Sequence, residues 1–183
     1  MKRFVLVILL GALAAPGVLS AKSLKEKAET EIFTVMKGVS LLSYSSVAIP
    51  VDLRKTIEKK VKQLFLRESV GVWRLEKNGE FQGIAILDHV MGKTQPFSFV
   101  VMFDPSGSVR SVRVVKYREQ YGGGIQGKGF LRQFEGKHRD STFVLGKDID
   151  GVSGSTISSL SIVRGVEKLA HLAASILVRD LEI

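Results

Sequence analysis

Apolar residues near the C-terminus of the chain recur at the spacing of an amphipathic helix. The stripe consists of Val163, Val166, Ala170, Ala173 and Leu177, and it is widened by Ile162, Leu169, Leu172 and Ile176. This pattern predicts a long helix with one broad face packed against a core. Small hydroxyl residues come directly before the stripe, so we expect them in the last loop residues and the first turn of this helix.

Two shorter helical patterns precede residue 70. The first ends near Gly38, and its apolar face is Leu24, Ala28, Ile32, Val35 and Met36. The second has the face Leu53, Ile57, Val61 and Leu64. We expect Asp52 to cap the second helix, and Glu58 and Lys62 to pair on its outer side. That helix should end near Phe65. Between the two helices, residues 39–49 are rich in serine and their pattern predicts no element.

From residue 70 the apolar period changes to two, which is typical of strands. Asn78-Gly79 is the strongest hairpin signal in the chain, and residues 97–103 form the nearly unbroken apolar run of a strand buried on both faces. The predicted strands cover residues 70–75, 81–90, 97–103 and 109–117. Three or four sequential strands predict an α+β fold, in which a twisted antiparallel sheet is flanked by N-terminal helices and a long C-terminal helix.

Residues 1–21 have the features of an export signal peptide. Lys2 and Arg3 precede an apolar run, and small residues offer a cleavage site after Ala21 or Ser20. The apolar stretch of about 18 residues is shorter than the roughly 20 that span a membrane comfortably. We therefore expect cleavage, with an uncleaved N-terminal anchor as the alternative. In either case the rest of the chain is exported, to the periplasm or beyond.

Composition narrows the chemistry of the chain. The 183 residues include no cysteine, which excludes disulfides, thiolate metal sites and iron–sulfur clusters. The three histidines, His89, His138 and His171, have no metal-ligand spacing with carboxylates. We expect no metal site, and we interpret each histidine as a surface or packing residue.

The formal net charge is +9, and loss of the two basic leader residues lowers it to +7. The basic residues are scattered, and no nucleic-acid motif is present, so we expect no nucleic-acid partner. The densest basic group is Lys55, Lys59, Lys60 and Lys62, on the second predicted helix. We interpret it as a solvated face, with contact to an anionic membrane surface as the alternative.

Residues 150–159 read Asp-Gly-Val-Ser-Gly-Ser-Thr-Ile-Ser-Ser and lead into the long C-terminal helix. Backbone N–H groups are unpaired at the start of a helix, and the helix dipole is positive there. This arrangement favours a bound phosphate group. The plainer interpretation is an ordinary capped helix, since Ser and Asp are common at helix starts for that reason alone.

The segment Asp150-Gly151-Val152-Ser153-Gly154-Ser155-Thr156 resembles the flavin-attachment motif of FMN-binding domains. These domains occur in the C and G subunits of the sodium-pumping quinone reductase and Rnf complexes, and in related small periplasmic flavoproteins. The resemblance implies that a flavin transferase joins the FMN phosphate to the hydroxyl of Thr156, the last residue of the motif. Ser155 stands where the family usually has alanine, which leaves a second hydroxyl beside the acceptor.

A glycine-rich segment follows the last predicted strand. Gly122, Gly124 and Gly127 satisfy the pattern Gly-x-Gly-x-x-Gly, but no strand ends directly before it and no long helix follows, so dinucleotide binding is weakly indicated. On composition alone a mobile surface loop is as good an interpretation. The segment also resembles the Glu-Thr-Pro-Gly-Leu-Gly loop of FMN-binding domains, without its proline. That resemblance implies that Glu119 orients the loop and that Tyr121 stacks on the flavin ring.

The predicted organisation is a signal peptide at 1–21, an N-terminal helical region at 22–69 and an FMN-binding domain at 70–183. The predicted function is an exported FMN-binding electron carrier or redox-complex subunit, without catalytic residues of its own. Its implied partners are a flavin transferase and a membrane redox complex or other electron-transfer protein. The predicted cofactor site is Thr156, Ser155, Gly154, Ser153, Asp150, Glu119, Tyr121, Gly122 and Gly124.

Two alternatives from other classes remain. One is a non-catalytic exported binding module that uses the basic helix to contact an anionic lipid or polymer. The other is a reductase acting directly on a small acceptor. The carboxylates of Asp148 and Asp150 could also be interpreted as an acid/base pair. The simpler interpretation is that they shape the turn before the helix.

Overall fold

A computed structural model describes residues 22–180 of the chain, and the signal peptide predicted for residues 1–21 lies outside the described residues. The helices are α1 (Leu24–Val35), α2 (Val51–Val61), α3 (Lys128–Arg132) and α4 (Thr156–Asp180), with a 3₁₀ turn η1 (Gly123–Gln126). The strands are β1 (Leu41–Ala48), β2 (Ser69–Lys77), β3 (Glu80–Met91), β4 (Pro96–Phe103) and β5 (Val109–Lys116).

The five strands form one antiparallel sheet in the order β1-β2-β3-β4-β5, so neighbours in sequence are neighbours in space. This confirms the predicted α+β class. Asn78 and Gly79 both have positive φ angles, as the β2–β3 hairpin requires. Every residue from Phe97 to Phe103 is fully buried, which confirms that β4 is covered on both faces.

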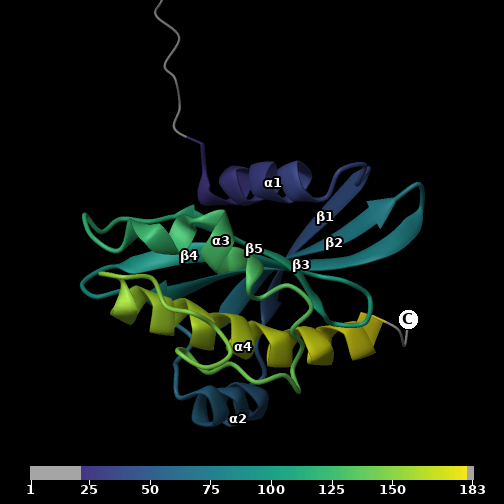
Figure 1. Cartoon of the computed structure of the whole chain (residues 1–183). Coiled ribbons are helices and arrows are strands. Elements are labelled where there is room, and N and C mark those ends of the chain that lie inside the picture. Colours follow the sequence, from purple (N-terminus) through teal and green to yellow (C-terminus); the bar gives the residue numbers. More distant parts are fainter. Residues whose placement is uncertain (1–21, 181–183) are drawn as a thin grey trace, which may run out of the picture.

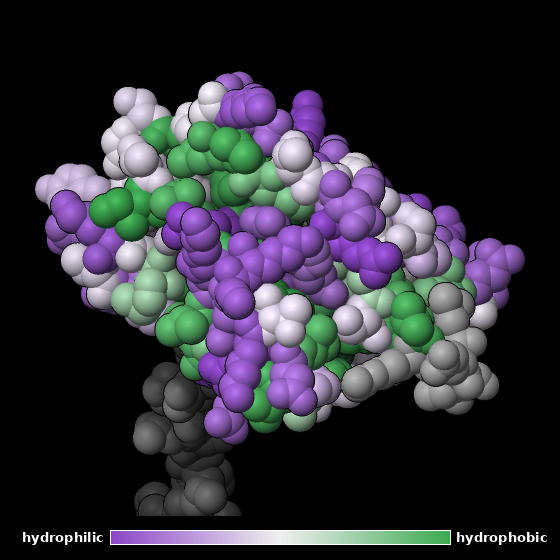
Figure 2. Space-filling view, turned by 90° about the horizontal axis from the view of Figure 1, so that it is seen from below, coloured by the Kyte–Doolittle hydropathy of each residue, from purple (hydrophilic) through white to green (hydrophobic). Residues whose placement is uncertain are grey.

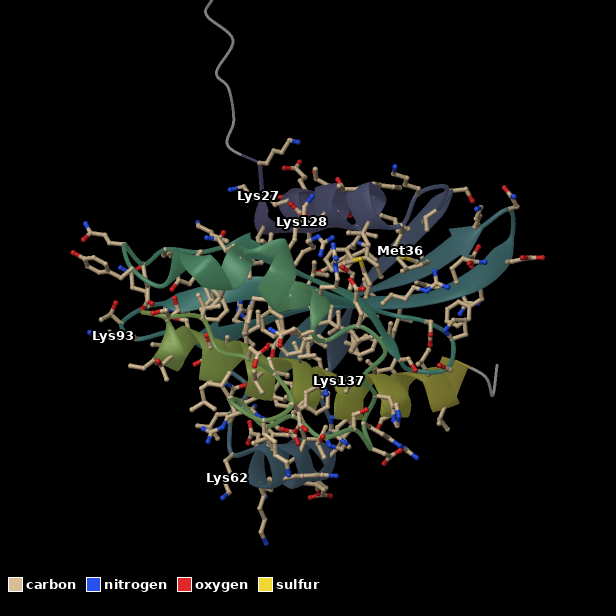
Figure 3. All side chains as sticks on the ribbon, viewed as in Figure 1. Lys27, Met36, Lys62, Lys93, Lys128 and Lys137 are labelled. Carbon is tan, nitrogen blue, oxygen red and sulfur yellow. The ribbon has the colours of Figure 1, made fainter. Side chains whose placement is uncertain are left out.

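Helices cover both faces of the sheet (Figure 1). On one face, Ala28 and Ile32 of α1 and its C-cap residue Met36 pack against Trp73 and other sheet residues. Met36 lies between α1 and the sheet in Figure 3. On the other face, the apolar stripe of α4 packs against the sheet, and α2 packs on the outer side of α4. The N-terminal helices are therefore part of the same folded unit as the sheet.

The α4 helix lies very close to the sheet at Gly165. A Cβ atom at this position would lie 2.8 Å from Cζ of Phe99 and 3.0 Å from Cγ1 of Val90. Only glycine lets the helix backbone approach these two side chains so closely. The contact sets the distance between α4 and the sheet, and with it the position of the start of α4.

Residues 39–49 differ from the prediction. Most of this serine-rich stretch, for which the pattern predicted no element, is strand β1. It pairs with β2 along Leu41–Ala48. The sheet thus includes a strand from each side of the predicted boundary between the N-terminal helical region (22–69) and the FMN-binding domain (70–183). Four of the eight residues of β1 are serine or alanine, so β1 lacks the apolar alternation of a half-buried strand, and its pairing comes from its place at the edge of the sheet.

The second helix also differs from its prediction. Pro50, rather than Asp52, is the N-cap residue, and α2 ends at Val61 because Lys62 adopts a left-handed conformation with φ 54°. Leu64, predicted on the buried face, is consequently 67% exposed. Glu58 pairs with Arg54 at 3.0 Å instead of with Lys62, and it also accepts a hydrogen bond from the backbone N–H of Phe65.

A buried ion pair lies between the sheet and α4. Nζ of Lys168 on α4 is 2.9 Å from a carboxylate oxygen of Asp88 on β3, and both side chains are at most 1% exposed. The same ammonium group donates a hydrogen bond to the carbonyl oxygen of Leu64 and lies 4.3 Å from the ring centre of Phe65. Lys168 therefore ties β3, α4 and the loop after α2 together.

Candidate functional site

A cleft of about 830 Å³ opens where α4 begins. Three segments form its walls: the turn between β3 and β4, the loop after β5, and the residues around the start of α4. In Figure 3 it lies toward the end of the molecule at which Lys93 is labelled. Its lining residues are Lys93, Thr94, Gln95, Arg118, Glu119, Gln120, Tyr121, Gly122, Gly154, Ser155, Thr156, Ile157 and Ser158. The volume lies within the usual range for small-molecule and cofactor sites.

Thr156 is the first residue of α4, and its side chain is exposed at the cleft. The preceding turn depends on Gly154, which has a φ of +73°. Ser155 closes this turn through a hydrogen bond from its N–H to the carbonyl oxygen of Val152, and its side chain is only 6% exposed. Of the two neighbouring hydroxyls, that of Thr156 is therefore the accessible one.

Glu119 links the three walls of the cleft. One of its carboxylate oxygens accepts hydrogen bonds from the backbone N–H groups of Thr94 and Gln95 and from the hydroxyl of Thr94. The other oxygen lies 3.2 Å from the hydroxyl oxygen of Tyr117 and accepts a hydrogen bond from Ser158 at 3.4 Å. The carboxylate thus ties the β3–β4 turn to the loop after β5 and to the first turn of α4.

Tyr117 and Ser158 belong to the site, although the sequence did not point to them. The hydroxyl oxygen of Tyr117 lies 3.0 Å from Oγ of Ser158 and donates to the carbonyl oxygen of Tyr121 at 2.8 Å. Ser158 is 3% exposed and comes from α4. Its position one helical turn before the apolar stripe could have indicated Ser158 from the sequence. The contact of Tyr117 with α4 joins residues 41 positions apart, and only the folded chain reveals it.

Gly122 makes room for the tyrosine hydroxyl. It has a φ of +83°, and a Cβ atom there would lie 2.5 Å from the hydroxyl oxygen of Tyr117. Any larger residue would displace Tyr117 as well as strain the backbone. The loop is not wholly mobile, because Ile125, Phe130 and Phe134 just after it are buried in the core.

Six of the nine predicted cofactor-site residues line the cleft and three do not. Those that line it are Thr156, Ser155, Gly154, Glu119, Tyr121 and Gly122. Tyr121 is 82% exposed at the rim of the cleft. Gly124, Ser153 and Asp150 lie outside the lining residues.

The backbone of Asp150 is hydrogen-bonded to Gln133, which is not among the residues lining the cleft. Its backbone N–H donates to the side chain of Gln133 at 2.7 Å, and its carbonyl oxygen accepts from the same side chain at 3.2 Å. This pair of hydrogen bonds fixes the start of the 150–156 segment on the loop after α3. The Asp150 side chain is exposed, which leaves its carboxylate accessible to another protein.

The charges around the cleft favour an anionic ligand. Lys93 and Arg118 line it, and the first turn of α4 contains no acidic residue to oppose the helix dipole. Glu119 is the one carboxylate among the lining residues, and its oxygens are occupied by the hydrogen bonds described above. A phosphate beside Thr156 would meet unpaired helix N–H groups and two cationic side chains.

Burial and hydrogen bonding act in opposite directions on Glu119. Burial raises the pKa of its carboxyl. The hydrogen bonds from the backbone N–H groups of Thr94 and Gln95 and from the hydroxyls of Tyr117 and Thr94 lower it by more, so the pKa lies below its ordinary value of 4.5. Burial and the nearby Glu119 carboxylate raise the pKa of Tyr117 above 10.0. At neutral pH the cleft therefore holds an ionised Glu119 and a protonated Tyr117.

We expect Glu119→Ala to lower the free energy of unfolding by about 2 kcal/mol at neutral pH, because it removes hydrogen bonds to a charged group. The folded-state pKa of Glu119 is depressed, so its stabilising effect is present above the unfolded pKa and is lost as the pH falls below 4.5. Urea denaturation of the wild type and the variant at several pH values measures the difference in their free energies of unfolding. A stability difference between wild type and variant that stays constant into the acid range would contradict the assignment.

Within residues 22–180, no three histidine or acidic side chains are grouped closely enough to hold a metal ion. The same part of the chain has no helix with the length and apolar character needed to cross a membrane.

One family model matches the part of the chain that contains the cleft. The model of the FMN-binding domain family matches residues 92–171, a range that contains every residue lining the cleft. No curated protein matches the chain significantly.

Two solved structures resemble the chain at low sequence identity. NqrC of Shewanella oneidensis has 18% identity and a TM-score of 0.47, over 67% of this chain and 62% of that one. The C subunit of the Na⁺-translocating NADH-quinone reductase of Parabacteroides distasonis has 16% identity and a TM-score of 0.46, over 81% of this chain and 98% of that one. The chain thus spans somewhat less than two thirds of the Shewanella protein.

Proposed function

We propose that this protein, whose residues 92–171 match the model of the FMN-binding domain family, binds FMN and is an exported electron-transfer flavoprotein. In this proposal FMN is attached covalently, through its phosphate, to Oγ of Thr156. The observation that carries the proposal is the accessible hydroxyl of Thr156 at the first residue of α4, facing a cleft of cofactor size inside the matched domain.

The residues of the cleft suit the parts of FMN. The helix start, with Lys93 and Arg118, suits the phosphate. The exposed ring of Tyr121 suits one face of a flat aromatic system. The network of Glu119, Tyr117 and Ser158 keeps these walls at a constant separation. In this proposal Ser155, which is only 6% exposed, supports the turn, and Thr156 is the acceptor.

Attachment requires an activated flavin donor and an enzyme. Oγ of Thr156 forms a bond to the phosphorus of the flavin phosphate, and the phosphoanhydride bond of a flavin dinucleotide breaks. A nucleoside monophosphate leaves, and the hydroxyl proton passes to a base. Within the described residues the chain places no side chain beside Thr156 that would act as this base, since Glu119 is fully engaged. We therefore infer a separate flavin transferase as the maturation partner, with the accessible Asp150 as part of its recognition segment.

Bound FMN supplies one- and two-electron redox chemistry. The chain's own residues bind and orient it and limit its exposure, and we assign none of them a catalytic role. An open cleft at one end of the molecule suits electron exchange with another protein, such as a membrane redox complex. A covalent link prevents loss of the flavin by diffusion from an exported protein.

The test is the mass and colour of the exported protein, purified from a host that also expresses a flavin transferase. We expect a yellow protein whose intact mass shows one FMN-sized increment, retained after denaturation. Peptide mapping should locate the increment on the peptide that contains Thr156. A colourless protein of unmodified mass would overturn the proposal, while a yellow protein that loses its flavin on denaturation would overturn only the covalent link.

A further inference from the structure

A basic surface on α2 is separate from the cleft. Lys55, Lys59 and Lys62 lie at positions i, i+4 and i+7, on the side of the helix opposite the buried Ile57 and Val61. All three lysines are exposed, and with Glu58, Gln63 and Leu64 they line a shallow hollow of about 410 Å³. We call this surface, together with the adjacent exposed Val51 and Leu66, the α2 face.

The three lysines of the α2 face form no ion pair with another described residue. In the described part of the chain, no carboxylate lies within ion-pair distance of any of them. Glu58, the nearest acidic residue of the hollow, is occupied by Arg54 and by the N–H of Phe65. The positive charge of this surface is therefore available to an external anion.

Large apolar side chains accompany these lysines. Leu64 is 67% exposed, Leu66 is 42% exposed and Val51 is 64% exposed, at either end of the row of lysines. The left-handed conformation of Lys62 ends the helix, after which Phe65 turns into the core and the two leucines turn out. Figure 2, which shows the molecule from the α2 side, has hydrophilic side chains gathered across this face with hydrophobic ones beside them.

We propose that the α2 face binds the surface of an anionic lipid bilayer. Lysines attract the charged headgroups, and exposed leucines beside them reach the boundary with the acyl chains. An acidic protein would satisfy the lysines, but it would gain less from the exposed leucines, and this favours the bilayer. The proposal is independent of the flavin function and does not require it.

Membrane contact through α2 leaves the cleft accessible. In Figure 3 Lys62 lies beside α2 at the bottom of the molecule, whereas Lys93 of the cleft lies at one end of the sheet. The first described residue, Lys22, precedes α1 on the opposite side of the sheet from α2. The bilayer would thus hold the protein beside a membrane partner while the site of Thr156 stays open.

The test is binding of the exported protein to vesicles of phosphatidylcholine, with and without about one third phosphatidylglycerol. We expect binding only to the anionic vesicles, with a strong decrease at high salt. Each lysine near an anionic surface contributes roughly fivefold to partitioning, so the triple variant Lys55→Gln/Lys59→Gln/Lys62→Gln should partition on the order of 100-fold less. Leu64→Ser/Leu66→Ser should also weaken binding, because it removes the apolar contact.

A matched control changes the same net charge elsewhere. Lys37, Lys77 and Lys128 are exposed and lie outside α2, and their triple replacement by glutamine should reduce partitioning far less. Equal losses in the two triple variants would mean that only overall charge matters and would overturn the proposal. Absence of binding to the anionic vesicles by a protein that does bind immobilised polyglutamate through these lysines would also overturn it, in favour of an acidic protein partner.

Discussion

Thr156→Ala is expected to remove the FMN-sized mass increment completely when the protein is coexpressed with a flavin transferase. The change deletes the oxygen that forms the ester bond, so no partial effect is expected. It should alter folding little, because the side chain is exposed and makes no hydrogen bond within residues 22–180. Intact-mass spectrometry measures the adduct, and urea denaturation measures the stability.

Ser155→Ala is the matched control for this change. Ser155 is adjacent to Thr156 in sequence and also has a hydroxyl, but it is only 6% exposed. Alanine is the residue usual at this position in the family motif. This variant should keep the full increment. If the increment survives in Thr156→Ala and disappears in Ser155→Ala, the acceptor is Ser155 and the start of α4 must open during maturation.

Lys168→Met is expected to lower the free energy of unfolding by about 3–5 kcal/mol, because it leaves the carboxylate of Asp88 buried without its partner. Folded proteins of ordinary stability have only about 5–15 kcal/mol in total. The variant should therefore be close to unfolding at physiological temperature. Urea denaturation at neutral pH measures the difference from wild type.

The double variant Asp88→Leu/Lys168→Met separates loss of the pair from loss of packing. Replacement of both partners by apolar residues of similar size is often nearly neutral, so it should recover most of the lost stability. Lys128→Met, at an exposed lysine, should change stability by no more than about 0.5 kcal/mol. A Lys168→Met variant as stable as the Lys128→Met control would show that the buried pair does not determine stability.

The sequence determined most of the secondary structure through its periodicity. The β2–β3 hairpin, the doubly buried β4 and the apolar face of α4 all follow from local patterns, because burial on one or two faces constrains residues two, three or four positions apart. The same pattern placed the hydroxyls of Ser155 and Thr156 at the start of a helix, and the resemblance in residues 150–156 indicated the ligand.

Only the tertiary structure decided how distant segments meet. Strand β1 has no distinctive pattern and forms because the free edge of β2 is available to pair. Tyr117 reaches Ser158 on α4, and Glu119 reaches the β3–β4 turn, through contacts between residues 24 to 41 positions apart. Lys168 is not part of the apolar stripe of α4, yet it is buried against Asp88 because α2 and its loop cover that side of α4. Local spacing determines which face of an element is buried, but the partner that buries it is chosen by the folded chain.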